Sequence, residues 1–274
     1  MSSIVQPRAQ ALQICEPVRD RILPTVSADD LSCILLPDVL ATIAPLKPEA
    51  WIEELSAAVS DGSFAVKRSI LDGMSISGIA RSLSEALNPC SLSPSVRTAL
   101  YDDILGLATA CADLTGTARF RFRFFTDVPN TRCSYHVDVV PPGSPTTALI
   151  RVYCGARTEY VEPSNVVSWE DFYAWEFWRK QQVRAIADAH ARQDAAAEER
   201  ATSRLARLDA KPHFLVHPEN VLTVPPHALV ACKFVDGKHL LDRTHVQARS
   251  ARGWIHRSPM AGVPRCVVTL NAVN

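Results

Sequence analysis

The segment Ala118–Phe125, with the sequence ARFRFRFF, alternates arginine with phenylalanine over most of its length. Successive side chains of an extended chain point to opposite sides, so the alternation separates the phenylalanines from the arginines on two faces. This is the pattern of a half-buried β-strand. Upstream of the segment apolar residues recur every three or four positions, whereas downstream they form short extended runs. The segment therefore marks a change from a helical to a β-rich part of the chain.

Two interpretations remain for Arg121 and Arg123, which lie on the face opposite the phenylalanines. We expect a solvated face, because arginine side chains mostly face water. The alternative is that they line the inside of a barrel and contact an anionic substrate.

Downstream of this strand, short apolar stretches separated by proline and glycine predict seven further strands. They comprise residues 134–140, 147–153, 157–161, 220–224, 228–234, 254–257 and 265–271. These strands do not alternate with helices, which favours an antiparallel sandwich or barrel over a nucleotide-binding parallel sheet. The chain also lacks the GxGxxG, P-loop and GxSxG motifs.

The N-terminal part of the chain has the pattern of amphipathic helices over residues 47–60, 75–87 and 93–115. Asn88-Pro89 ends the second helix and Gly116 ends the third, since the residue before proline avoids the helical region and glycine favours a helix C-terminus. We therefore expect a mainly helical region over residues 1–116, followed by a β-rich domain over residues 117–274.

Residues 169–210 interrupt the strands with a stretch rich in Ala, Arg, Glu and Gln that contains no proline or glycine. This composition predicts one long helix or a pair of helices. We expect a solvated helical insertion. A lid over a site, or an arm that forms a homodimer, is the alternative.

The composition excludes several classes of protein. Lys and Arg number 29 and so do Asp and Glu, so the chain has no basic excess of the kind that nucleic-acid binding usually requires. No apolar run approaches the ~18 residues of a membrane span, and the first residues lack the features of a signal peptide. The eight cysteines form no CxxC pair, which predicts reduced thiols rather than a disulfide framework. We expect a cytoplasmic protein that acts on a small molecule or another substrate the sequence does not identify.

A metal site is predicted from three separated residues. His136 and Asp138 are two positions apart on a predicted strand, so both side chains would reach the same ion. His256 on a later strand would complete a set of two imidazoles and one carboxylate, which leaves one side of the metal open and suits non-haem Fe(II). Nine residues further on, Arg265 opens the last strand. Its guanidinium would bind the far carboxylate of a dicarboxylate cosubstrate with two hydrogen bonds, while the other end of the cosubstrate binds the metal.

Each of these residues also has a purely structural interpretation. His136 and Asp138 would form a hydrogen-bonded pair, His256 would be an interior histidine, and Arg265 would pair with an acidic neighbour. Glu159 is a candidate to orient a ligand histidine, or a turn residue.

The order HxD, His, Arg resembles that of Fe(II)/2-oxoglutarate-dependent dioxygenases, whose fold is a double-stranded β-helix of the cupin-like jelly-roll type. From about residue 132 to 271 the chain also resembles an uncharacterised bacterial family, a domain of unknown function. The segments that carry this resemblance are residues 133–138, 151–155, 158–160 and 256–259, Arg265, and residues 267–270.

The resemblance implies an α+β protein in which a helical N-terminal region packs on a double-stranded β-helix with a long helical insertion. It implies that His136, Asp138 and His256 are catalytic iron ligands and that Arg265 binds the cosubstrate 2-oxoglutarate. The alternative function is a non-redox, zinc-binding or metal-responsive cupin-type protein, because the same ligands suit Zn(II). A third is an interaction protein whose working surface is the helix over residues 169–210, which is also where the alternative homodimer would form.

Overall fold

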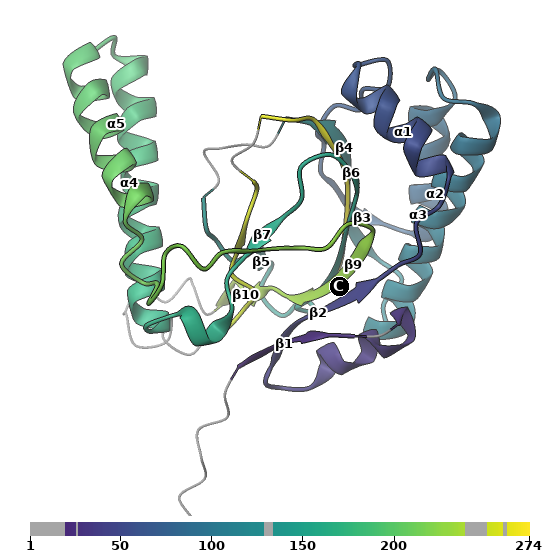
Figure 1. Ribbon diagram of the computed structural model, residues 1–274, viewed down its shortest axis with the longest axis horizontal. Coiled ribbons are helices and arrows are strands. Elements are labelled where there is room, and N and C mark those ends of the chain that lie inside the picture. Colours follow the sequence, from purple (N-terminus) through teal and green to yellow (C-terminus); the bar gives the residue numbers. More distant parts are fainter. Residues whose placement is uncertain (1–19, 26, 129–133, 239–250, 260–261) are drawn as a thin grey trace, which may run out of the picture.

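The computed structural model describes residues 20–25, 27–128, 134–238, 251–259 and 262–274, and its elements form layers (Figure 1). Helices cover one face of a large sheet, several short strands lie on the other side of it, and a helical hairpin stands outside those strands. No helix in the described part of the chain is long and apolar enough to cross a membrane. The fold is thus mixed α+β with a large, mostly antiparallel sheet.

The large sheet has seven strands in the order β1-β2-β9-β6-β12-β4-β3, and only the β1–β2 pairing is parallel. The strands are β1 (Arg21–Pro24), β2 (Val39–Pro45), β3 (Leu71–Met74), β4 (Phe120–Asp127), β6 (Thr147–Cys154), β9 (Ala228–Lys233) and β12 (Arg265–Ala272). The strands predicted at 118–125, 147–153, 228–234 and 265–271 are confirmed. No strand was predicted upstream of residue 118, yet β1, β2 and β3 all come from there. The division of the chain into domains at residue 116 stays a prediction.

Five short strands form two smaller sheets, β10-β5 and β11-β7-β8. They are β5 (Val139–Val140), β7 (Glu159–Tyr160), β8 (Leu222–Thr223), β10 (Val235–Asp236) and β11 (His256–Arg257). An isolated antiparallel bridge joins His136 to His256, with reciprocal backbone hydrogen bonds of 2.9 and 3.0 Å. Val235 donates a further backbone hydrogen bond to Asp138 at 2.8 Å. These bonds connect the two small sheets into one layer.

Helices α1 (Trp51–Ser60), α2 (Ile76–Leu87) and α3 (Pro94–Thr115) cover the helical face of the large sheet, with η1 (Ala28–Leu35) beside them. Each predicted helix is confirmed. Ser75 and Ser93 cap α2 and α3 by accepting backbone N–H bonds, and Gly116 ends α3 at φ 69°. The helices bury their apolar stripes against three of the four phenylalanines of β4, Phe120, Phe122 and Phe124, forming the first core.

Two other cores lie beyond the large sheet. The second core fills the space between the large sheet and the short strands, and includes Phe125, Ile150, Val267 and Trp254. The third core lies between the short strands and the start of α4, and combines aromatic with aliphatic side chains. It includes Tyr135, Trp169, Phe172, Trp175 and Phe214. Both faces of the short-strand layer are therefore buried.

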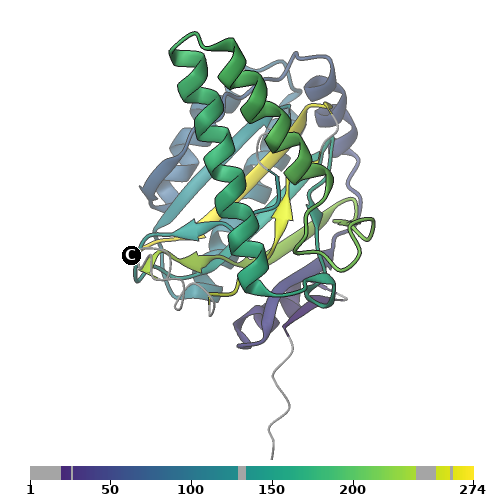
Figure 2. The same cartoon turned by 90° about the vertical axis from the view of Figure 1, so that its left-hand side faces the viewer.

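The insertion is a helical pair, α4 (Trp169–Ala191) and α5 (Ala195–Ala210), which crosses in front of the sheets (Figure 2). It follows η2 (Pro163–Asn165). Arg179 of α4 forms an ion pair with Asp209 of α5 at 2.7 Å, which holds the hairpin together. The start of α4 packs on the short strands. The prediction of a solvated insertion is therefore wrong for this part of the helix. Further along α4, Phe177 and Trp178 are 51% and 57% exposed.

Candidate metal centre

The bridge between the two small sheets brings three predicted side chains together. His136 and Asp138 lie on the segment that leads into β5, and His256 is the first residue of β11. One ligand atom from each residue lies within 4.8 Å of the others. The Nε2 atom of His256 is 3.5 Å from the Oδ2 atom of Asp138. Among the described residues this is the group of histidine, cysteine and carboxylate side chains arranged to hold a metal ion.

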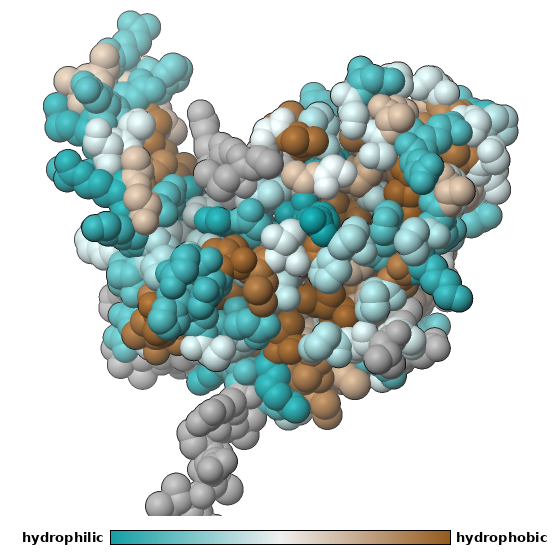
Figure 3. Space-filling view, viewed as in Figure 1, coloured by the Kyte–Doolittle hydropathy of each residue, from teal (hydrophilic) through white to brown (hydrophobic). Residues whose placement is uncertain are grey.

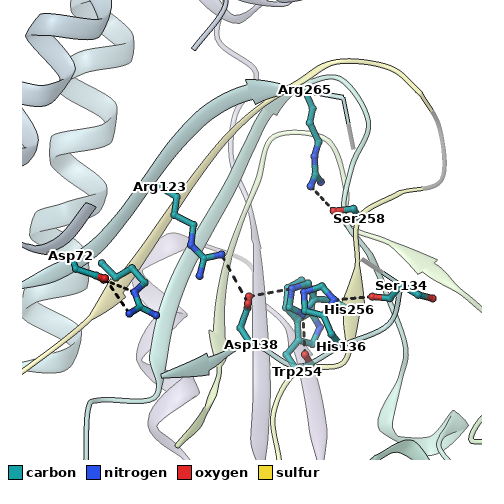
Figure 4. A network of polar contacts seen from close by, with 10 residues as sticks. Asp72, Arg123, Ser134, His136, Asp138, Trp254, His256, Ser258 and Arg265 are labelled. Carbon is teal, nitrogen blue, oxygen red and sulfur yellow. Dashed lines mark hydrogen bonds and ion pairs between the residues drawn. The ribbon is translucent and has the colours of Figure 1, made fainter. Parts of the chain in front are cut away.

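Both imidazoles are oriented by backbone carbonyls. The Nδ1 atom of His136 donates to the carbonyl of Ser134 at 2.8 Å, and that of His256 donates to the carbonyl of Trp254 at 3.0 Å (Figure 4). A proton on Nδ1 leaves the lone pair on Nε2, and in His256 Nε2 is the atom that lies near Asp138. This is the arrangement that metal-binding histidines usually have.

The ionisation of the centre also suits a cation. Burial lowers the pKa of His136 to about 4, helped by the charge of His256 and opposed by that of Asp138. Burial raises the pKa of Asp138, but the adjacent His256 ring, His136 and the charge of Arg123 outweigh it, so the net pKa falls well below its usual range. His136 is therefore neutral and Asp138 ionised near neutral pH, which are the forms that bind metal.

Trp254 fixes the plane of His256. The two rings are stacked with centroids 4.5 Å apart and 15° between their planes, and Trp254 is only 1% exposed. The ring of His136 lies 4.5 Å from that of His256 at 48°. Aromatic packing therefore limits the rotation of the His256 ring, whose position is already set by the backbone bridge to His136.

Arg265 lies at the start of β12 on the same side of the large sheet as the triad (Figure 4). It is buried, and its Nη2 atom donates to the Ser258 hydroxyl at 2.8 Å. Gly155, with φ 81°, allows the end of β6 to pass directly against this residue, because a Cβ there would lie 2.0 Å from the carbonyl oxygen of Pro264 and 2.7 Å from Arg265 Cα. Its position is therefore set by backbone packing.

Arg123 also faces the centre, which the sequence analysis did not favour. Its Nη1 atom lies 4.0 Å from Asp138. Arg121, two residues earlier, is instead paired with Asp72 on β3, with Nε to Oδ1 at 2.5 Å. The expected solvated face is thus wrong for Arg123. The alternation in β4 showed that Arg121 and Arg123 share a face of the strand. It did not show that the layer of short strands covers that face at Arg123.

Glu159 does not orient a ligand histidine. It pairs with Arg257 at 2.6 Å, on the strand pairing between β7 and β11. The carbonyls of Ser134 and Trp254 perform the orienting role, and a sequence gives no signal for a backbone acceptor of this kind.

An open cavity of about 830 Å³ lies elsewhere, on the helical side. It is lined by α1 and the end of β6, with Glu49, Glu53, Tyr153, Cys154 and His227 among its residues. None of the triad residues lines it. Since it gathers no set of metal ligands, the triad remains the better candidate for a functional centre.

The family described as "Protein of unknown function (DUF1826)" matches residues 26–210. The chain belongs to this family. His136 and Asp138 lie within the matched residues, whereas His256 and Arg265 lie beyond them. The resemblance to an uncharacterised family is thus confirmed, but the DUF1826 match begins in the N-terminal region, about a hundred residues before the predicted start at 132.

Two solved structures share distant similarity with this DUF1826 member. The crystal structure of a dioxygenase for auxin oxidation (DAO) from rice is 12% identical over 93% of this chain and 83% of that one, with a TM-score of 0.36. A full-length Neurospora crassa protein, solved in complex with alpha-KG, is 8% identical over 85% and 73%, with a TM-score of 0.34. Such distant likenesses assign no activity to this chain. The sequence matches no curated protein.

Proposed function

We propose that this DUF1826 protein is a non-haem Fe(II)/2-oxoglutarate-dependent dioxygenase. The observation that carries the proposal is the triad of His136, Asp138 and His256, whose ligand atoms lie within 4.8 Å of one another. Two imidazoles and one carboxylate on one side of an ion leave the other side open for a cosubstrate and oxygen, as non-haem Fe(II) oxygenases require.

The protonation states of the three ligand side chains suit a metal ion. Each imidazole uses Nδ1 for a backbone hydrogen bond and leaves Nε2 for a metal, and the Asp138 carboxylate is ionised. When bound, Fe(II) and 2-oxoglutarate would supply the oxidative chemistry, which no amino-acid side chain provides. The residues of the protein hold, orient and shield these groups.

Arg265 and Ser258 are the groups proposed to hold the distal carboxylate of 2-oxoglutarate. The guanidinium already contacts the serine hydroxyl at 2.8 Å, so both donors are in place before a ligand arrives. A guanidinium and a hydroxyl together suit a carboxylate, which accepts several hydrogen bonds. Because Arg265 is buried, water competes little for this interaction.

The scaffold proposed for the site is a double-stranded β-helix. The large sheet and the layer of short strands face each other across the second core, and Trp254 of this core stacks on His256 of the triad. Side chains such as Tyr160 and Trp254 fill the space beside His256 and exclude water from it.

The test is a pair of measurements on the full chain. Protein purified without chelators should contain close to one divalent ion per chain, and His136→Ala should lose it. His190→Ala is the matched control, because His190 lies on α4 with an 80% exposed side chain. Anaerobic addition of 2-oxoglutarate to the Fe(II) protein should then produce a weak visible charge-transfer band.

Other results would decide against an oxygenase. Tight retention of zinc, with no such band from the Fe(II) protein, would support a non-redox metal-binding protein on the same ligands. Equal metal content in His136→Ala and wild type would remove the centre altogether.

A further inference from the structure

We infer that Arg123 binds a carboxylate of the substrate, so that the site acts on acidic small molecules. This inference rests on the proposed function, because it concerns what binds beside the metal and 2-oxoglutarate. It assigns to Arg123 the selection of the substrate.

The register of the large sheet turns Arg123 inward. Arg123 pairs with Thr269 on β12, and Thr269 pairs with Ile150 on β6. Residues directly opposite on paired strands share a face. Ile150 belongs to the second core, between the large sheet and the short strands, so Arg123 points into the same space as the triad.

The guanidinium of Arg123 has a charge neighbour but no hydrogen-bond partner on its Nε atom. Nη1 lies 4.0 Å from Asp138, beyond the range of a hydrogen bond. Nε is buried and has no hydrogen-bond partner among the described residues. A buried donor without an acceptor is costly, and the edge formed by Nε and Nη2 is the edge that binds a carboxylate with two parallel hydrogen bonds.

A ligand can reach this group. The side chain of Arg123 is 25% exposed and that of Asp138 is 19% exposed. The side chain is therefore partly accessible to a ligand, although Nε itself is covered, so a carboxylate that pairs with Nε and Nη2 would require the guanidinium to turn toward it.

The charges around the metal also call for an anion. A divalent ion and Arg123 together carry three positive charges, and Asp138 supplies one negative charge. The carboxylate of 2-oxoglutarate at the metal would supply a second, since Arg265 is the group proposed to hold its other carboxylate. One positive charge remains beside the metal in a partly buried space, where an unpaired charge is unfavourable. A substrate carboxylate on Arg123 neutralises it.

Arg121 provides an internal control for this reasoning. It lies on the same strand and the same face, but both of its edge nitrogens contact Asp72, Nε at 2.5 Å and Nη2 at 3.3 Å. Its charge is therefore already paired within the protein, whereas Arg123 lies 4.0 Å from a carboxylate that the metal would share.

The experiment measures binding of two probes of similar shape and different charge, benzoate and benzamide. The full chain is loaded with Zn(II), which is redox-inert, and saturated with 2-oxoglutarate, and dissociation constants are taken from ligand-observed NMR titrations. Wild type should bind benzoate about tenfold more tightly than benzamide, the scale of a charge-assisted hydrogen bond. This ratio should fall to about one in Arg123→Gln, persist in Arg121→Gln and be partly retained in Arg123→Lys.

Three outcomes would overturn the inference: a ratio near one in wild type, an unchanged ratio in Arg123→Gln, or an equal loss in Arg121→Gln. Zinc content and thermal unfolding of each variant show whether the centre and the fold are intact, and Arg123→Lys tests the same point if Arg123→Gln does not fold. Failure of the proposed function would instead show as no binding of 2-oxoglutarate to the metal-loaded wild type. The benzoate ratio is measured without 2-oxoglutarate as well, so the two failures are separate.

Discussion

Each face of the large sheet carries an arginine that points into the protein, but the two arginines differ in how closely a carboxylate pairs with them. On the helical face, Arg151 of β6 is 2% exposed, contacts Asp103 of α3 and lies over the ring of Tyr153 at 4.6 Å. On the face toward the short strands, Arg123 lies 4.0 Å from Asp138. The first arginine has a carboxylate of its own. The second shares one with the candidate metal.

This difference suggests that the helical face contributes mainly to stability and the opposite face mainly to ligand binding. The helical face is filled by the first core and its charge is paired within the protein, although two nitrogens of Arg151 have no hydrogen-bond partner among the described residues. The opposite face combines an apolar core with the triad, Arg123 and Arg265. We expect substitutions on the helical face to lower the free energy of unfolding, and those on the other face to change ligand binding.

The largest expected effect is on the helical face. Phe122→Ala removes a ring that is 2% exposed in the first core and should lower the free energy of unfolding by about 3–5 kcal/mol. Urea denaturation of metal-free protein measures it. Arg121→Ala, one residue away on the other face, should cost less than about 1 kcal/mol, because exposed ion pairs contribute little. Similar losses in both variants would mean that the two faces of β4 are not distinct.

The arginines themselves give the next largest effect. Arg151→Met should cost about 3 kcal/mol, since it leaves the Asp103 carboxylate, which also accepts a hydrogen bond from the Tyr153 hydroxyl, without its cation. Arg123→Met should change the stability of metal-free protein by less than about 1 kcal/mol, because it removes a distant ion pair and an unpaired donor together. Denaturant midpoints of the two variants compare them directly. A larger cost at Arg123 would contradict the division of roles.

A substitution at Gly155 tests whether the position of Arg265 depends on its contact with the end of β6. Gly155→Ala should lower the free energy of unfolding by about 2 kcal/mol, because φ is 81° and the new Cβ would clash with the backbone of Pro264. The shift would displace Arg265, so titration of the metal-loaded variant should show weaker binding of 2-oxoglutarate. Metal content should be unchanged. A variant with normal 2-oxoglutarate affinity would show that Arg265 does not depend on this contact.

The smallest effect on stability is expected on α4. Trp178 is 57% exposed, so Trp178→Glu should change the free energy of unfolding by less than about 0.5 kcal/mol. A homodimer through residues 169–210, the alternative to a solvated insertion, would nevertheless dissociate, because a charge would enter an apolar contact that includes Phe177. Sedimentation equilibrium measures the change. Figure 3 shows some hydrophobic residues, in brown, among the hydrophilic ones of this hairpin, in teal. A wild type that is monomeric at all concentrations would exclude the dimer.

Local sequence features determined much of this fold. The alternation in β4, the serine caps of α2 and α3 and the glycine at the end of α3 are signals within a few residues, and the elements form as those signals predict. The two-residue spacing of His136 and Asp138 likewise indicated side chains that reach one site. The short strands were placed approximately, since 134–140 became a bridge followed by β5.

Other features depended on contacts between distant parts of the chain. Strands β1, β2 and β3 are stabilised by pairing within the large sheet, and their own sequences carry no comparable alternation. Only the bridge between residues 136 and 256 brings the second imidazole to the first. The inward role of Arg123 was decided in the same way: the sequence placed it on one face of a strand, but which face is interior depends on the layer that packs against it, and no local pattern encodes that layer.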